Sequence, residues 1–151
     1  MLTLPLDALL PHAGRMRLID RVVSYDEHKI VCESDSHRLA DHPLVEGARL
    51  SIVCGLEYGA QAMALHGALM AAEGGHPRRG YLVAASNLRW STERLDTYEA
   101  PLIIEANSEF RSENQVAYRF EIRVDAKVVL TGEARVQLSK PDDGSVHETG
   151  L

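Results

Sequence analysis

Glu57 and Gln61 interrupt a long apolar stretch, residues 50–73, and their spacing of four places them on one face of a helix. A carboxylate in the middle of a buried apolar helix is costly unless it is paired, hydrated or protonated. Glu57 could therefore be a structural residue bonded to the backbone, or an acid that donates a proton at neutral pH. Gln61 could orient Glu57 from one turn away, or serve as a hydrogen-bonded core amide.

His42 lies upstream of this stretch, in a loop of residues 36–49 that is rich in His, Asp, Pro and Gly. A neutral imidazole is a suitable base at pH 7, although a loop histidine is more often a surface residue. An imidazole and a carboxyl in one apolar pocket could together remove one proton from a substrate and donate another. Cys54 faces roughly the same side as Glu57 and could line that pocket, but only His42 supports a nucleophilic thiolate there. We expect His66, about half a turn round the helix from Glu57, to be a satisfied core or interface residue.

The element that must position the carboxyl is a helix over residues 50–73. Ser51 is a plausible N-cap, and the glycine pair at 74–75, followed closely by a proline, is a strong stop signal. The stretch is apolar almost all the way round, which is typical of a helix buried inside a domain. A membrane span is disfavoured because a carboxyl, an amide and a histidine lie within it.

The remaining periodic segments are strands, and the last third of the chain alternates between polar and apolar residues. Period-2 patterning with one polar face is typical of an antiparallel sheet that is solvated on one side. The apolar face needs a cover, and the helix is the long apolar element available. We therefore expect an α+β fold, in which one curved antiparallel sheet wraps around one buried helix. The expected strands span residues 16–25, 29–35, 80–90, 101–110, 115–124 and 128–138. One face of the fourth strand is expected to carry Ile104, Ala106, Ser108 and Phe110. One face of the fifth is expected to carry Val116, Tyr118, Phe120, Ile122 and Val124.

Length and composition indicate a single domain over residues 1–139, followed by a polar tail, residues 140–151, that we expect to be disordered. The net charge of −6 argues against a general nucleic-acid footprint. The spacing of Cys and His residues matches no metal site, and Cys32 and Cys54 fit a reduced cytoplasmic protein. The first residues lack the basic region of a secretory signal.

Four local motifs carry a resemblance to a known family. They are LPHAGRMRLIDRV at residues 10–22, His42-Pro43 in the loop, GLEYGAQ at residues 55–61, and Gly80-Tyr81-Leu82 followed by NLRW at residues 87–90. With these, the chain resembles the hot-dog fold β-hydroxyacyl-(acyl carrier protein) dehydratases, and among them the shorter aryl-polyene-type dehydratases, over roughly residues 5–138. The His-Pro and Glu-Tyr-x-Ala-Gln elements, at this separation, are the specific part.

The resemblance implies that His42 takes the α-proton of a 3-hydroxyacyl thioester and that Glu57 protonates the departing hydroxyl, which yields the trans-2-enoyl thioester. It also implies that the two residues come from different subunits of a homodimer, a higher homo-oligomer or a heterodimer with a related dehydratase. No metal or redox cofactor is expected. Gly55 and Gly59, with Ala60, would leave room for a substrate tunnel beside the helix.

The loop departs from the family pattern, since it reads His-Pro-Leu-Val-Glu-Gly rather than His-Phe-Pro, and Ser51 stands where related chains tend to have proline. The oxyanion donor is therefore not placed, and the backbone N–H groups of Val45 and Gly47 are the candidates. The substrate-binding residues expected from the sequence are Val45, Gly47, Cys54 and Gln61.

The expected carrier of the substrate is an acyl carrier protein, or else CoA. Acyl carrier proteins are acidic, so Arg78 and Arg79 are candidates for a docking surface, with Arg15 and Arg17 as alternatives. These arginines could equally be ordinary solvated residues. Two other functions remain open: a hot-dog thioesterase that activates water with a carboxylate, and a non-catalytic subunit that pairs with an active dehydratase.

Overall fold

One antiparallel sheet curls around one long helix. The computed structural model describes Leu6 and residues 16–74 and 80–139. The predicted C-terminal tail, Arg15, Arg78 and Arg79 lie outside these ranges. The strands are β1 (Arg21–Tyr25), β2 (Lys29–Ser34), β3 (Gly80–Trp90), β4 (Leu102–Arg111), β5 (Gln115–Val124) and β6 (Lys127–Leu138), and the helices are η2 (Ser36–Arg38), η3 (Ile52–Cys54) and α2 (Gly55–Glu73).

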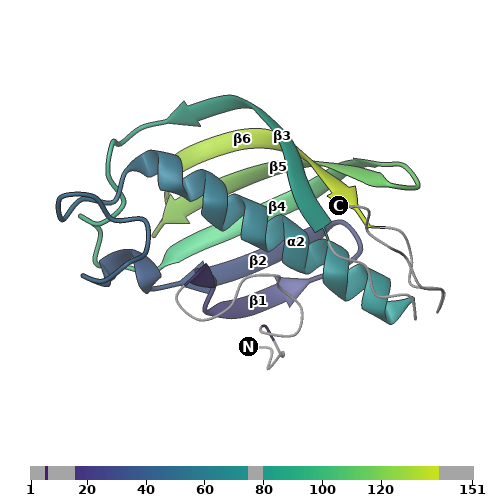
Figure 1. The fold of residues 1–151 in the computed structure, drawn as a ribbon, viewed down its shortest axis with the longest axis horizontal. Coiled ribbons are helices and arrows are strands. Elements are labelled where there is room, and N and C mark those ends of the chain that lie inside the picture. The colour runs from purple at the N-terminus through teal and green to yellow at the C-terminus, as the bar shows by residue number, and fades with distance from the viewer. Residues whose placement is uncertain (1–5, 7–15, 75–79, 140–151) are drawn as a thin grey trace, which may run out of the picture.

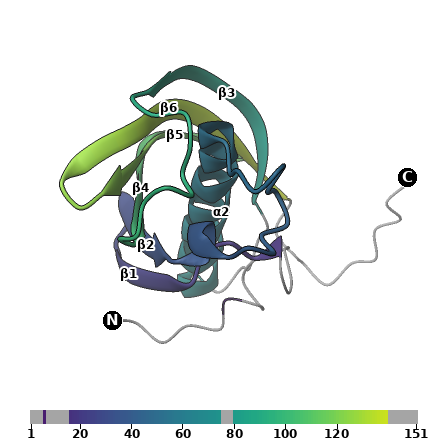
Figure 2. The ribbon, with the colours of Figure 1, turned by 90° about the vertical axis from the view of Figure 1, so that its left-hand side faces the viewer.

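The six strands form one sheet in the order β1-β2-β4-β5-β6-β3, and every neighbouring pair is antiparallel. Figure 1 shows α2 lying across this sheet. In Figure 2 the sheet curves around the helix, with the two edge strands β1 and β3 on opposite sides of it. The predicted α+β architecture, a curved sheet around a buried helix, is confirmed. Within the described ranges, no helix has the length and hydropathy needed to cross a bilayer.

The helix begins and ends where its local signals predict. Ser51 has extended backbone angles, and its Oγ accepts a hydrogen bond from the N–H of Val53 at 3.2 Å, so it is the N-cap. The first turn, η3, is a 3₁₀ turn that runs directly into α2, and α2 ends before Gly74. The predicted helix is thus observed with its first turn tightened.

Two glycines let α2 lie directly on the sheet. A Cβ added at Gly59 would lie 2.7 Å from the ring of Phe120, and one at Gly55 would lie 2.5 Å from the side chain of Leu130. Large side chains of β5 and β6 therefore already fill the space beside these glycines. The expectation that Gly55 and Gly59 leave room for a substrate tunnel was wrong, because they serve close helix–sheet packing instead.

The core faces of β4 and β5 follow the predicted alternation except at a bulge in β4. On β5, the five predicted inward residues, Val116, Tyr118, Phe120, Ile122 and Val124, are all buried. On β4, Ile104 and Ala106 are buried, but the register shifts between Ser108 and Phe110. The β-bulge turns Phe110 outward to 67% exposure, so its predicted place on the inner face was wrong.

His66 links the helix to two parts of the sheet. Its Nδ1 lies 2.7 Å from the Oη of Tyr118 on β5, and its Nε2 lies 2.8 Å from the carbonyl oxygen of Asp26 in the β1–β2 turn. The ring is fully buried, and that burial lowers the pKa of His66. The prediction of a satisfied core histidine is confirmed.

Candidate active site

His42 is buried within its loop, with 2% of its surface exposed. Its Nδ1 accepts a hydrogen bond from the backbone N–H of Leu44 at 3.0 Å, and its Nε2 lies 3.1 Å from the Oη of Tyr58 on α2. A backbone N–H can only donate, so Nδ1 must be the acceptor nitrogen of the neutral ring. The ring proton is therefore on Nε2, which donates to the phenol oxygen of Tyr58.

Behind His42, a chain of hydroxyl groups continues into the sheet. The Oη of Tyr58 lies 2.5 Å from the Oγ of Ser36, which in turn lies 2.8 Å from the Oγ of Ser34. Both serine hydroxyls donate to the carbonyl oxygen of Leu18, at 3.0 and 2.5 Å. Burial raises the pKa of the Tyr58 phenol well above its ordinary value, so this hydroxyl stays neutral.

Glu57 is half-buried one position before Tyr58 and belongs to a second group of hydrogen bonds. The Nε2 of Gln61 donates to Glu57 Oε1 at 3.3 Å and to the carbonyl oxygen of Met16 at 2.7 Å. The Oε1 of Gln61 accepts from the N–H of Leu18 at 2.8 Å. Gln61 is a fully buried, hydrogen-bonded core amide, as one of its two interpretations predicts, and it also contacts the carboxyl of Glu57.

The peptide groups of Leu18 join the imidazole side of the site to the carboxyl side. The N–H of Leu18 donates to Gln61, and its carbonyl oxygen accepts from Ser34 and Ser36. Leu18 lies in the motif at residues 10–22, which stood out in the sequence only through its resemblance. Its structural role is to hold both polar groups against the helix.

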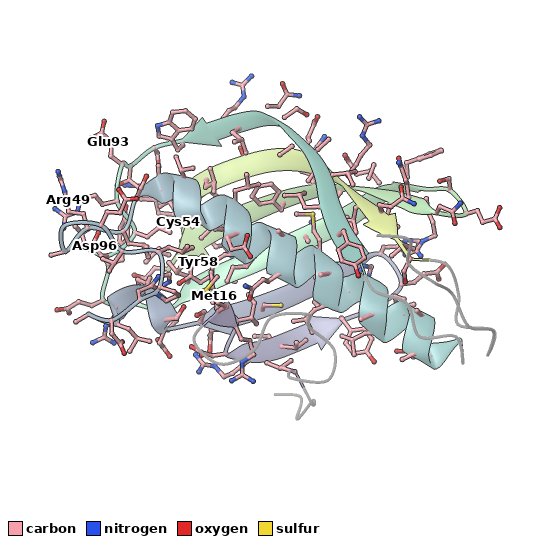
Figure 3. All side chains as sticks on the ribbon, in the orientation of Figure 1. Met16, Arg49, Cys54, Tyr58, Glu93 and Asp96 are labelled. Carbon is pink, nitrogen blue, oxygen red and sulfur yellow. The ribbon has the colours of Figure 1, made fainter. Side chains whose placement is uncertain are left out.

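A pocket of about 610 Å³ opens where α2 begins. Its lining residues are Leu44, Glu46, Arg49, Ser51, Val53, Cys54, Glu93 and Arg94. Figure 3 shows Arg49, Cys54 and Glu93 gathered at this end of the molecule, with Tyr58 further along the helix. The lining set contains Leu44, the residue that binds His42, and Cys54, but neither His42 nor Glu57.

Cys54 lines the pocket at the start of α2, and its environment opposes a thiolate. Burial and the negative charge of Glu46 both raise the pKa of the Cys54 thiol. Its Sγ lies 4.0 Å from the carbonyl oxygen of Leu44. The side chain is therefore a neutral lining group rather than a nucleophile.

The two candidate oxyanion donors sit in different turns. The N–H of Val45 donates to the carbonyl oxygen of His42 at 3.2 Å, so that bond would have to open for Val45 to bind a substrate. Gly47 and Ala48 have φ values of +56° and +64° in a tight turn closed by mutual backbone bonds between Glu46 and Arg49. Glycine favours such a turn, which gives Gly47 a structural reason to be there.

Few of the arginines expected to dock a carrier protein lie within the described residues. Of the four arginines expected to dock a carrier protein, only Arg17 is described, and it is half-buried. Arg94, beside the pocket, is paired with Asp96 at 2.5 Å. Among residues 16–74 and 80–139, the His, Cys, Asp and Glu side chains form no group of three that could hold a metal ion.

A helix held in the hollow of a six-stranded antiparallel sheet defines the hot-dog fold. The chain belongs to the ApeP-like dehydratase family, whose model, described as ApeP dehydratase, matches residues 4–148. A search of curated protein sequences found no significant match.

Solved structures share the fold at low sequence identity. The dehydratase heterocomplex ApeI:P from Xenorhabdus doucetiae superposes with a TM-score of 0.81 at 21% identity, covering 91% of this chain and 92% of that one. AziG from S. sahachiroi gives a TM-score of 0.62 at 16% identity, with coverages of 85% and 96%. The thioesterase HI1161 from Haemophilus influenzae gives 0.58 at 12% identity, with coverages of 78% and 76%.

Tyr58 and Ser36 are the polar residues of the site that sequence reasoning missed. A tyrosine inside an apolar helix must find a partner for its hydroxyl, and that requirement was the available signal. Nothing local in the sequence indicates that the partners are His42 and Ser36, because these come from the preceding loop.

Proposed function

We propose that this chain dehydrates a 3-hydroxyacyl thioester to the trans-2-enoyl thioester, with His42 as the base and Glu57 as the acid. Membership of a dehydratase family supports the reaction class. The observation that supports the residue roles is that hydrogen bonds hold both the imidazole of His42 and the carboxyl of Glu57 beside the first turns of α2. These are the two group types that the reaction needs.

The chemical step moves two protons in opposite directions. His42 removes the proton from the carbon next to the thioester carbonyl, and the C–H electrons form the new double bond. The C–O bond at the next carbon breaks as Glu57 gives its proton to the leaving hydroxyl, which departs as water. A backbone N–H of the loop, from Val45 or Gly47, stabilises the negative charge on the thioester oxygen.

The complete site forms between two subunits. In one protomer, the described bonds tie His42 to Tyr58 and Glu57 to Gln61. The edge strand β3 exposes Tyr81, Leu82, Val83 and Trp90, an apolar edge that suits pairing with a second hot-dog subunit. The partner is a second copy of this chain or a related dehydratase, and the Xenorhabdus doucetiae structure is itself a heterocomplex.

The substrate arrives on an acyl carrier protein or on CoA, in the cytoplasm. Arg78 and Arg79 remain the proposed docking residues for an acidic carrier. The free cysteines Cys32 and Cys54 fit a reducing compartment. The pocket at the start of α2 lies beside the loop of His42 and is the proposed approach for the thioester.

The test is to incubate the purified protein with a 3-hydroxyacyl thioester and follow enoyl absorbance. Glu57→Gln and His42→Ala should each lower the rate by about 100-fold or more. Equal rates for the unmodified protein and both variants would remove the assignment. Release of free thiol without enoyl product would instead identify a thioesterase.

A second candidate function is a subunit that supports an active dehydratase without using its own residues. The observation in its favour is that both ring nitrogens of His42 are engaged in hydrogen bonds. The assay should therefore be repeated after mixing the chain with a related dehydratase. Activity that needs the partner and is unchanged by Glu57→Gln identifies this second function.

A further inference from the structure

We propose that Tyr58 and Ser36 are positioning residues that hold His42 in a single tautomer, with the proton on Nε2 and Nδ1 left as the basic nitrogen. This inference rests on the proposed dehydratase function and adds the group that sets which nitrogen reacts. It stands on a directed chain of hydrogen bonds that can be followed from the loop into the sheet.

At its first end, the direction of the hydrogen-bond chain is set by Leu44. Its backbone N–H points at Nδ1 of His42 at 3.0 Å, and a proton on Nδ1 would place two donors face to face. The neutral ring therefore carries its proton on Nε2. The phenol oxygen of Tyr58, 3.1 Å from Nε2, is an acceptor for that proton.

The far end of this hydrogen-bond chain allows the same direction. The carbonyl oxygen of Leu18 accepts from both serine hydroxyls, and the Oγ of Ser34 also lies 3.3 Å from a carboxylate oxygen of Asp20. A carbonyl oxygen can only accept. Ser36 can therefore donate toward Leu18 and present a lone pair to the O–H of Tyr58, which in turn can present a lone pair to His42. The bonds behind Tyr58 are thus compatible with the tautomer that Leu44 selects.

This arrangement decides which nitrogen can act as the base. Nε2 keeps its proton because Tyr58 and Ser36 each donate their own proton away from His42. Nδ1 has the lone pair, and Leu44 N–H must turn aside when Nδ1 takes the substrate proton. Leu44 lines the pocket at the start of α2, so a substrate in that pocket is placed to displace this N–H. The freed N–H lies beside Nδ1 and becomes a further donor for the thioester oxygen.

The experiment compares Tyr58→Phe with a matched control, Tyr118→Phe. Each variant removes one buried phenol hydroxyl that is bonded to a buried histidine, but Tyr118 serves His66 and lies outside the site. Protein labelled with nitrogen-15 histidine is examined by NMR, and the His42 signals are assigned by their loss in His42→Gln. The unmodified protein should show a bare Nδ1 and a protonated Nε2 whose proton exchanges slowly.

Tyr58→Phe should abolish the slow exchange of the His42 Nε2 proton, while Tyr118→Phe should leave it unchanged. In the dehydration assay, Tyr58→Phe should lower kcat by about 10- to 100-fold with KM changed less than about threefold, because orientation is lost rather than binding. Ser36→Ala, which keeps the phenol but removes its acceptor, should act in the same direction more weakly. If Tyr58→Phe does not fold, Ser36→Ala tests the proposal in its place.

A His42 that carries its proton on Nδ1 in the unmodified protein overturns the proposal. So does a Tyr58→Phe protein with unchanged exchange and unchanged kcat. The NMR signature requires no turnover, so it separates this proposal from the dehydratase assignment: a protein without dehydratase activity can still show the predicted tautomer.

Discussion

Helix α2 carries two histidine–tyrosine pairs of opposite polarity. In the first pair, Tyr58 on α2 accepts from His42 of the loop, because a backbone N–H occupies Nδ1 of that ring. In the second, His66 on α2 donates from Nε2 to the carbonyl oxygen of Asp26, so its Nδ1 accepts from the hydroxyl of Tyr118. The same two side chain types thus form one arrangement around the proposed base, His42, and another that joins the helix to the sheet.

The surroundings of the two pairs explain their different uses. The His66 pair lies between α2 and the sheet, and the partners of the ring are Tyr118 of β5 and the backbone of the β1–β2 turn. The His42 pair lies between a loop and the helix, and Leu44, its backbone donor, borders the pocket of about 610 Å³. A buried imidazole becomes useful for chemistry when one of its partners can be displaced by a substrate.

The largest expected effect comes from replacing each histidine with glutamine. His42→Gln should lower the dehydration rate by about 100-fold or more, since glutamine is no base. His66→Gln should leave kcat within about threefold but lower the free energy of unfolding by about 2–3 kcal/mol, because buried partners lose their bonds. Rates and urea unfolding curves measured on both variants check this. If the two variants exchanged these outcomes, the division between site and core would be wrong.

Gln61, between the two pairs along α2, should show an intermediate effect. Gln61→Leu leaves the carbonyl of Met16 and the N–H of Leu18 without their buried partner, and it removes a contact to Glu57. We expect a loss of about 2–4 kcal/mol in the free energy of unfolding. Gln61→Glu is the matched control, because it keeps the acceptor for Leu18 but removes the donor to Met16. Equal stability of Gln61→Leu and the unmodified protein would contradict this role of Gln61.

Removing one hydroxyl from the core pair should cost less. Tyr118→Phe deletes the donor to His66 Nδ1 but keeps the ring packed against α2. The free energy of unfolding should fall by about 1–2 kcal/mol. In a double-mutant cycle with His66→Gln, the two losses should be less than additive, since both remove the same hydrogen bond. Full additivity would show that the bond contributes nothing.

The smallest expected effect is a pH dependence of stability. Burial lowers the pKa of His66 in the folded state from its ordinary value of 6.5, and burial also lowers the pKa of His37. The unfolded chain then binds more protons than the folded chain below pH 6.5, so stability falls as the pH drops through this region. The slope should not exceed about 1.4 kcal/mol per pH unit for each histidine.

Urea unfolding at a series of pH values, on the unmodified protein and on His66→Gln, measures this slope. The variant should show a shallower decline because one of the two histidines whose pKa is lowered by burial is gone. A decline of the same steepness in both proteins would assign the pH dependence to other groups.

Local signals in the sequence predicted the main elements, and they placed Glu57 and Gln61 on one face of the helix. The N-cap at Ser51 and the glycine stop set the helix, and alternation set β5, because both depend on neighbours along the chain. The bulge that exposes Phe110 was missed, since one extra residue in a strand leaves no trace in a period-2 pattern until the partner strand is known. The same limit applies to Gly55 and Gly59, whose packing role depends on side chains of β5 and β6.

By itself, the sequence determined that a carboxyl and an amide lie on one face of a buried helix, and that a histidine precedes them. Helix periodicity and capping are local, so these facts need no knowledge of the rest of the fold. Only the tertiary structure decided that His42 meets Tyr58, that Ser36 stands behind it, and that Leu18 joins this group to Gln61 and Glu57. Most buried polar atoms find a partner, but which partner each one finds depends on which loop or strand the fold brings opposite.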